Sequence, residues 1–115
     1  MKLFSIFDGK KTTETTKVAT AYTKEFTYLP SYHWIQATEY TPATLEEPFG
    51  EAKYLINNTK DTPVYVAYRD ILIKDGWAIT DEMAVTRFSA NKDTHIANIW
   101  IIISDNDVIL NVRSK

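Results

Sequence analysis

The stretch HIANIWIIISDNDVILNVRSK, residues 95–115, decides the fold because it holds two apolar segments around four polar residues. In the second segment Val108, Leu110 and Val112 point inward and Asn111 and Arg113 point outward, a period of two that is typical of a β-strand. The first segment is apolar on both alternating sides toward its end. We therefore predict an antiparallel hairpin whose first strand is central and covered on both faces, which would bury Trp100.

The polar residues between the two segments, Ser104 to Asp107, suit a tight turn. Asp and Asn tolerate a left-handed backbone and bond to nearby amides, which is what such a turn requires. Calcium binding would need a glycine and a distant glutamate after the alternating acidic residues. Asp105 and Asp107 are instead followed by valine, isoleucine and leucine, so we predict a turn and no metal site.

The residues before this hairpin divide into two further strands and one ambiguous segment. Residues 77–80 and 84–90 favour strands and are bounded by clusters of turn residues. Residues 63–75 fit a helix, because their apolar side chains recur every three or four positions, and they also fit a strand that turns at Asp75-Gly76. We favour the helix, with Thr62 before it and one apolar face made of Val64, Ala67, Tyr68, Ile71 and Leu72.

The middle of the chain, residues 41–58, carries Pro42, Pro48 and Gly50 and shows no clear alternation. We expect one short helix there, broken near Pro48 and ended by the two asparagines at its close.

The N-terminal third favours strands again. Residues 19–29 and 32–40 alternate in β-favouring side chains, so we expect two antiparallel strands with a short connection at Pro30. Residues 1–17 fit either a hairpin that turns at Asp8-Gly9 or a flexible lead-in. Together these segments predict a single α+β domain over residues 1–115. It has two layers: a mainly antiparallel sheet of five to seven strands, and one or two short helices packed on one face.

Composition limits the class of protein. The chain has 115 residues, 44% hydrophobic and 24% charged, which is ordinary for a globular domain that buries its own core. A net charge of −2 and a pI near 5.6 argue against a general DNA-binding protein. The first residues hold too short an apolar run for a secretory signal, and no run approaches the length of a membrane span. We expect a soluble cytoplasmic protein with no membrane partner.

Residues with catalytic chemistry are scarce. The chain has no cysteine, which excludes disulfides, thiolate catalysis and cysteine-ligated zinc. The only histidines, His33 and His95, lie in different expected strands, and neither has a second histidine at ligand spacing. With three glycines there is no nucleophile elbow and no phosphate-binding loop. We predict no catalytic residue, metal or cofactor, and an enzyme acting on a small molecule is the least favoured class.

The unusual feature is a concentration of aromatic side chains between residues 22 and 40. The candidate binding face consists of Tyr22, Lys24, Phe26, Tyr28, Tyr32, Trp34 and Tyr40. It fits the core-facing side of a sheet, a face for a protein partner or a second copy, or a platform on which single-stranded nucleic acid bases stack. On such a platform Lys17 and Lys24 would contact phosphates. Gln36 and Thr38 lie on the same side and are poor core residues, so they favour an exposed face for either kind of partner.

We therefore expect a non-enzymatic protein-binding or accessory module whose partner is another protein or a second copy of the chain. Small size, lack of cysteine and richness in Ile, Thr, Lys and Asn fit a protein of a phage or other mobile element that binds and modulates a host or viral protein. The alternative is a single-stranded nucleic-acid-binding protein, which the net charge of −2 disfavours.

Overall fold

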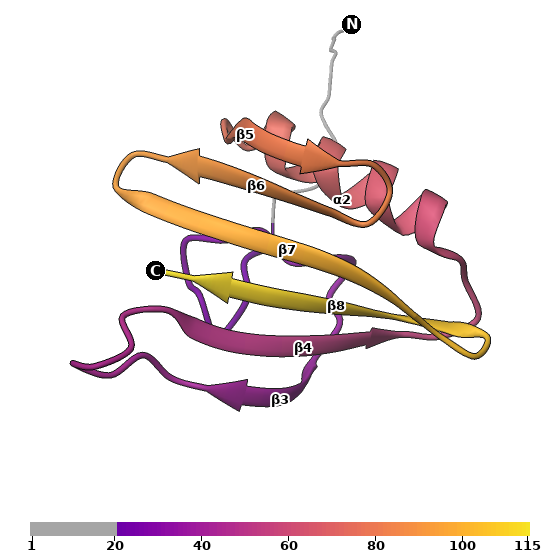
Figure 1. Ribbon diagram of the computed structural model, residues 1–115, viewed down its shortest axis with the longest axis horizontal. Helices are drawn as coiled ribbons and strands as arrows, with labels where there is room; N and C mark the ends of the chain where they lie inside the picture. The colour runs from indigo at the N-terminus through magenta and orange to yellow at the C-terminus, as the bar shows by residue number, and fades with distance from the viewer. Residues whose placement is uncertain (1–20) are drawn as a thin grey trace, which may run out of the picture.

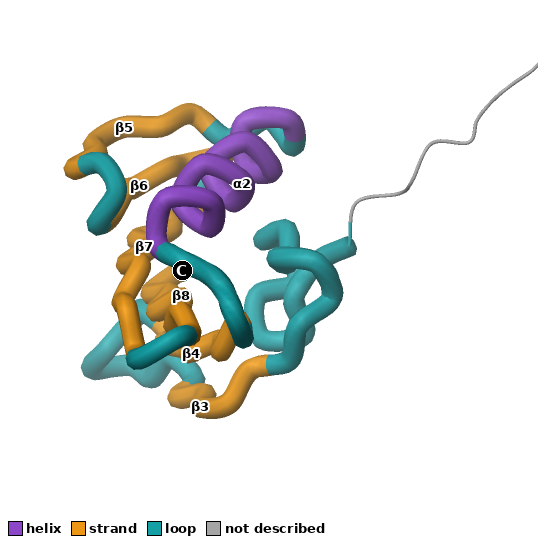
Figure 2. The backbone as a smooth tube through the Cα atoms, turned by 90° about the vertical axis from the view of Figure 1, so that its right-hand side faces the viewer, coloured by secondary structure: helices purple, strands orange, loops and turns teal. Residues whose placement is uncertain are grey.

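A computed structural model describes residues 21–115, so the expected hairpin or lead-in over residues 1–17, including Lys17, lies outside the described residues. Within the described range the chain forms one antiparallel sheet of six strands and one helix, α2 (Asp61–Lys74). The helix and the irregular segment 21–36 lie on the same side of the sheet (Figures 1 and 2). The predicted two-layer α+β fold is confirmed.

The sheet has the strand order β3-β4-β8-β7-β6-β5, and every neighbouring pair is antiparallel. Its strands are β3 (Ala37–Thr41), β4 (Gly50–Ile56), β5 (Ala78–Met83), β6 (Arg87–Lys92), β7 (His95–Ser104) and β8 (Asp107–Ser114). The predicted hairpin is therefore the centre of the sheet, with two strands on either side of it (Figure 1).

The polar tip of this hairpin is a turn, as predicted. Ser104 pairs with Asp107, and Asp105 has the left-handed backbone, with φ of 55°, that aspartate tolerates. The tip also holds the connection from β4 to α2, because the Asp107 carboxylate accepts a hydrogen bond from the Asn58 amide at 2.8 Å. The Thr59 amide donates to a second tip residue, the carbonyl of Asn106, at 3.1 Å. The four polar residues thus have a structural role.

The helix predicted over residues 63–75 is confirmed and begins slightly earlier, at Asp61. An acid in its first turn and Lys74 in its last turn match the helix dipole. Gly76, with φ of +95°, adopts the left-handed conformation that ends the helix. The predicted apolar face packs into the core mainly through Val64, Tyr68 and Leu72, and Tyr65 joins them.

The helix expected over residues 41–58 is wrong. Residues 42–49 form a loop that contains both prolines, and β4 follows. Ala52, Tyr54 and Ile56 point into the core on alternate positions. Pairing with β3 on one side and with β8, which is distant in sequence, on the other determines this segment.

The strand expected over residues 19–29 is also wrong in the described part, and the next strand starts only at Ala37. Thr23 explains much of the difference, because its hydroxyl donates to the Phe26 carbonyl and accepts from the Phe26 amide, both at 2.8 Å. Such local side-chain bonds offer the backbone an alternative to a sheet. An isolated bridge joins Tyr22 to Pro30, which was expected to lie in the connection between the two strands.

One further expectation fails at Trp100. Its strand, β7, is central as predicted, but only the face that carries Ile99 and Ile101 is packed against the helix layer. Trp100 lies on the opposite face and is only partly buried. No helix, strand or loop within residues 21–115 forms a second layer over that face (Figure 2).

A matched pair of leucines tests this one-sided packing. Leu110 on the packed face is 1% exposed and Leu55 on the opposite face is 38% exposed. Leu110→Ala should lower the free energy of unfolding by about 2–5 kcal/mol, because it leaves a cavity in the core. Leu55→Ala should lower it by less than about 1 kcal/mol. Urea denaturation of both variants gives the comparison, and equal losses would contradict the assignment of the two faces.

Candidate functional site

The seven residues of the predicted aromatic face do not share one face. Most of them lie in the irregular segment 21–36, on the helix side of the sheet (Figure 2). Phe26 is buried, Tyr28 and Tyr32 are partly buried against the core, and Tyr22, Lys24, Trp34 and Tyr40 are exposed. The core interpretation therefore holds for part of the set and the exposed interpretation for the rest.

The buried members fasten the segment to the sheet. Tyr28 stacks on His95 with ring centroids 3.6 Å apart and shares a 2.8 Å hydrogen bond with the Ser114 hydroxyl on β8. Partial burial raises the pKa of Tyr28 above its ordinary value. Tyr68 of α2 donates a 2.7 Å hydrogen bond to the carbonyl of Pro30, so the segment is tied to the helix as well.

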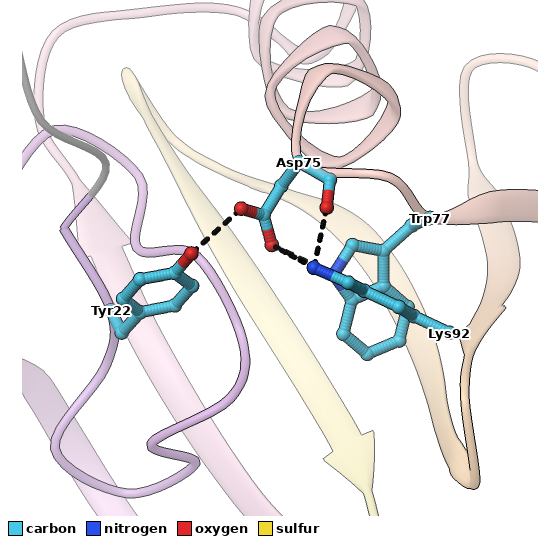
Figure 3. A network of polar contacts seen from close by, with 4 residues as sticks. All are labelled: Tyr22, Asp75, Trp77 and Lys92. Atoms are coloured by element: carbon cyan, nitrogen blue, oxygen red, sulfur yellow. Dashed lines mark hydrogen bonds and ion pairs between the residues drawn. The ribbon is translucent and has the colours of Figure 1, made fainter.

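Asp75, at the C-terminal end of α2, is the main polar junction of this region (Figure 3). Its carboxylate accepts hydrogen bonds from the Tyr22 hydroxyl at 2.7 Å, the Trp77 indole at 3.3 Å and the Lys92 ammonium at 3.3 Å. Lys92 also donates to the Asp75 carbonyl at 2.6 Å. The bond to the carboxylate raises the pKa of Tyr22, because losing its proton would place two anions side by side.

The Asp75 junction joins segment 21–36, the helix end and β6, and its charges are already paired with each other. A pocket of about 220 Å³ lies beside it, with Tyr28, Trp77, Lys92 and His95 in its walls. Its one lysine is held by Asp75, and its histidine, His95, is stacked on Tyr28. We interpret the junction as structural.

Trp34 stands apart from these anchors. It is 71% exposed, and both it and His33 have left-handed backbone, with φ of 67° and 50°. Two successive non-glycine residues in that region are uncommon and costly, and such strain is concentrated at functional sites. Trp34 lines a surface pocket of about 150 Å³ together with Tyr22 and Lys24. The structure thus brings three of the seven predicted residues together.

A second surface was not expected from the sequence. We call it the open face, and it consists of the outward side chains of the sheet centred on Leu55, Ile109, Ile102 and Trp100. Leu55 lies opposite Ile109, and Ile109 lies opposite Ile102, so the three form a row across β4, β8 and β7. Trp100 lies two residues before Ile102 in β7, so both side chains are on the same side of the sheet. Leu55 and Ile102 are 38% and 44% exposed, which makes this row an accessible apolar surface.

Ion pairs surround the apolar row on the same side of the sheet. Lys53 lies 3.6 Å from Glu39, Arg87 lies 2.7 Å from Asp81, and Arg113 lies 3.0 Å from Glu47. The Arg87 hydrogen bond lowers the pKa of Asp81. Each of these three basic side chains is paired with a carboxylate. The surface therefore has an apolar centre and a rim of ion pairs.

The sequence held one signal for this surface. In β8 the alternation that sends Val108 and Leu110 inward also sends Ile109 outward, together with Asn111. An outward isoleucine next to the outward positions of β7 would have indicated an apolar row. The expectation that β7 is covered on both faces concealed it.

No family model, curated protein or solved structure matches this chain. Residues 21–115 contain no group of three or more side chains placed to hold a metal ion. In the same range no helix is long and apolar enough to cross a membrane.

The exposed position of Trp34 yields a direct test. Trp34→Ala should change the free energy of unfolding by no more than about 0.5 kcal/mol, because the side chain has few contacts to lose. If the Trp34 pocket contributes to partner binding, the same change weakens that binding. A melting temperature lowered as far as by a core substitution would instead show that the ring is packed inward in solution.

Two buried tyrosine hydroxyls should make the stability of the protein fall at alkaline pH. Burial raises the pKa of Tyr54 and of Tyr65 above the ordinary value of 10.0, and both also donate to a carboxylate. Because the pKa of each phenol is higher in the folded state, the protonated phenol stabilises the fold. This contribution to the free energy of unfolding is complete below the pKa of the unfolded state and is lost as pH rises through the pKa of the folded state. The free energy of unfolding should therefore fall as pH rises above about 10. Urea denaturation from neutral to alkaline pH measures this, and Tyr54→Phe should reduce the slope.

Proposed function

We propose that this chain is a non-enzymatic protein-binding module and that the open face docks a partner protein. The observation that carries the proposal is the row of Leu55, Ile109 and Ile102 beside Trp100, which no second layer within residues 21–115 covers. A contiguous apolar patch on a small protein commonly marks an interaction surface.

The chemistry of the open face fits a protein partner. Protein interfaces have an apolar centre with a polar rim, and tryptophan and arginine are enriched among the residues that dominate binding. Here Trp100 lies opposite Arg87 on β6, and the ion pairs of Lys53 and Arg113 lie farther out along the sheet. The partner we propose presents a complementary apolar patch.

Single-stranded nucleic acid is the alternative, and the same surface weighs against it. Such binding uses unpaired cations along the backbone and several aromatic platforms for the bases. Among the described side chains the central open face has one aromatic ring, Trp100, and its lysine and arginines are paired with carboxylates. Binding to an oligonucleotide that weakens steeply with salt would favour this alternative over ours.

The role that we propose for the module is accessory. It would act in the cytoplasm, as a protein of a phage or other mobile element that binds and modulates a host or viral protein. Small size, lack of cysteine and the Ile-, Thr-, Lys- and Asn-rich composition support this part of the proposal.

Ile102→Asp tests the docking surface. A charge at the centre of the open face should weaken partner binding about thirtyfold or more, as loss of a dominant contact does. Ile73→Asp is the matched control, since Ile73 is 42% exposed, as Ile102 is 44% exposed, but lies on α2 on the other side of the sheet. Affinity capture from a lysate of the source organism, followed by titration of the captured protein, gives the comparison.

Circular dichroism of both variants should match the wild-type protein, and their melting temperatures should fall by similar small amounts, because the two side chains are about equally exposed. A partner that binds Ile102→Asp as tightly as it binds Ile73→Asp contradicts the proposal. A dimer of the wild-type chain that Ile102→Asp dissociates would make the partner a second copy.

A further inference from the structure

We propose that β5 and the groove beside it bind an uncharged, extended peptide segment by strand addition. This surface is separate from the open face, and the inference does not depend on what the open face binds.

β5 is an edge strand of the sheet. It stands at one end of the strand order and pairs only with β6 among the described strands. A terminal strand has backbone amides and carbonyls on its outer side that no ladder satisfies, and these are a template for another extended chain. The strand is irregular between Ile79 and Asp81, so the regular edge is the stretch from Asp81 to Met83.

The acidic side chains of this edge are bonded to other side chains of the domain. Charged side chains commonly protect an edge strand from pairing. Here Asp81 is bonded to Arg87 at 2.7 Å on the open-face side of the sheet. Glu82 is bonded on the helix side, to Arg69 at 2.7 Å and to the Tyr65 hydroxyl at 3.0 Å. Both carboxylates are engaged within the domain.

A groove lies between this edge and α2. Figures 1 and 2 both show α2 beside β5 at the same end of the sheet. A hollow of about 400 Å³ lies between them, lined by Tyr65, Val66, Ala67 and Ala84 and by the charged side chains of Arg69, Asp70 and Glu82. Val66 is 57% exposed there. An added strand would lie about 4.8 Å from β5, and its alternate side chains on the helix side would reach this groove.

Charge pairing defines the occupant. Arg69 is paired with Glu82, Asp70 with Lys74 at 3.0 Å, and Asp81 with Arg87. Because each charged side chain of the groove is paired with an opposite charge, the groove offers no net charge to attract a charged peptide. An uncharged segment with a small or medium apolar side chain facing Val66 and Ala84 does not depend on such an attraction. The opposite edge, β3, has no comparable helix contact, because α2 packs against β5, β6 and β7.

The test uses the full chain as bait for a display library of random seven-residue segments. The expected result is enrichment of sequences with apolar residues on alternate positions and few charges. Val66→Lys should weaken capture of the selected peptides about tenfold or more, because it replaces the exposed apolar side chain of the groove by an unpaired cation. Ile73→Lys is the matched control, since Ile73 lies two turns farther along the same side of α2 and outside the groove.

Amide hydrogen exchange separates strand addition from simple groove binding. One selected peptide, synthesised with blocked ends, should slow the exchange of amides in β5 and leave those of β3 unchanged. The proposal is overturned if no sequence is enriched, if the enriched sequences are charged, if Val66→Lys retains them, or if β5 amides exchange as before. A wild-type dimer that Val66→Lys dissociates would make the occupant a second copy and overturn the peptide assignment.

The same variants distinguish this inference from the proposed function. Ile102→Asp should retain the displayed peptides while losing the partner protein, and Val66→Lys should do the reverse. Either proposal can therefore fail without the other.

Discussion

The fold depends on a geometric constraint: one helix cannot cover a six-stranded sheet. Six strands at about 4.8 Å spacing span about 24 Å, whereas a helix with its side chains is only about 10 Å across. α2 accordingly packs against β5, β6 and β7 and leaves the other half of the same face unprotected. Segment 21–36 covers that half, as the contacts of Tyr28 with β8 and of Glu25 with Tyr54 on β4 show. With helix and segment both on one side, the described chain has no layer for the other side.

Segment 21–36 lies between the core and water, which explains why it is rich in tyrosine and irregular in backbone. A ring at the boundary between core and water buries its apolar body while its hydroxyl needs a polar partner. The segment and the surfaces beneath it meet that demand repeatedly: the Tyr28 hydroxyl bonds to Ser114, and the Tyr68 hydroxyl bonds to the Pro30 carbonyl. Asp75 completes the closure by accepting bonds from Tyr22 on the segment and Lys92 on the sheet. These bonds are made between particular atoms, so the segment has a definite course without belonging to the sheet.

The sequence predicted those parts of the fold that local pattern determines. The β7–β8 hairpin and α2 carry strong periodicity and suitable end residues, and both are where they were expected. β4 was missed because Phe49, Ala52 and Ile56 also match a helical spacing, and the pairing that selects the strand comes from β8, more than 50 residues away. The aromatic segment alternates like a strand, yet the local bonds of Thr23 and the coverage needed by the sheet determine its path. For the candidate site the limit was the same: alternation shows which residues share a face, but not whether a second layer covers that face.

The open face and the β5 edge are related through one side chain. Met83 lies opposite Arg87, and Arg87 lies opposite Trp100, so Met83 belongs to the open-face side of the sheet although it stands on the terminal strand. A strand added beside Met83 would therefore widen the open face by one strand as well as fill the groove next to α2. The two surfaces present different chemistry, since the edge offers backbone groups and the open face offers side chains. Because the two surfaces use different groups, an added strand at β5 and a partner protein on the open face would bind to the same sheet side by side.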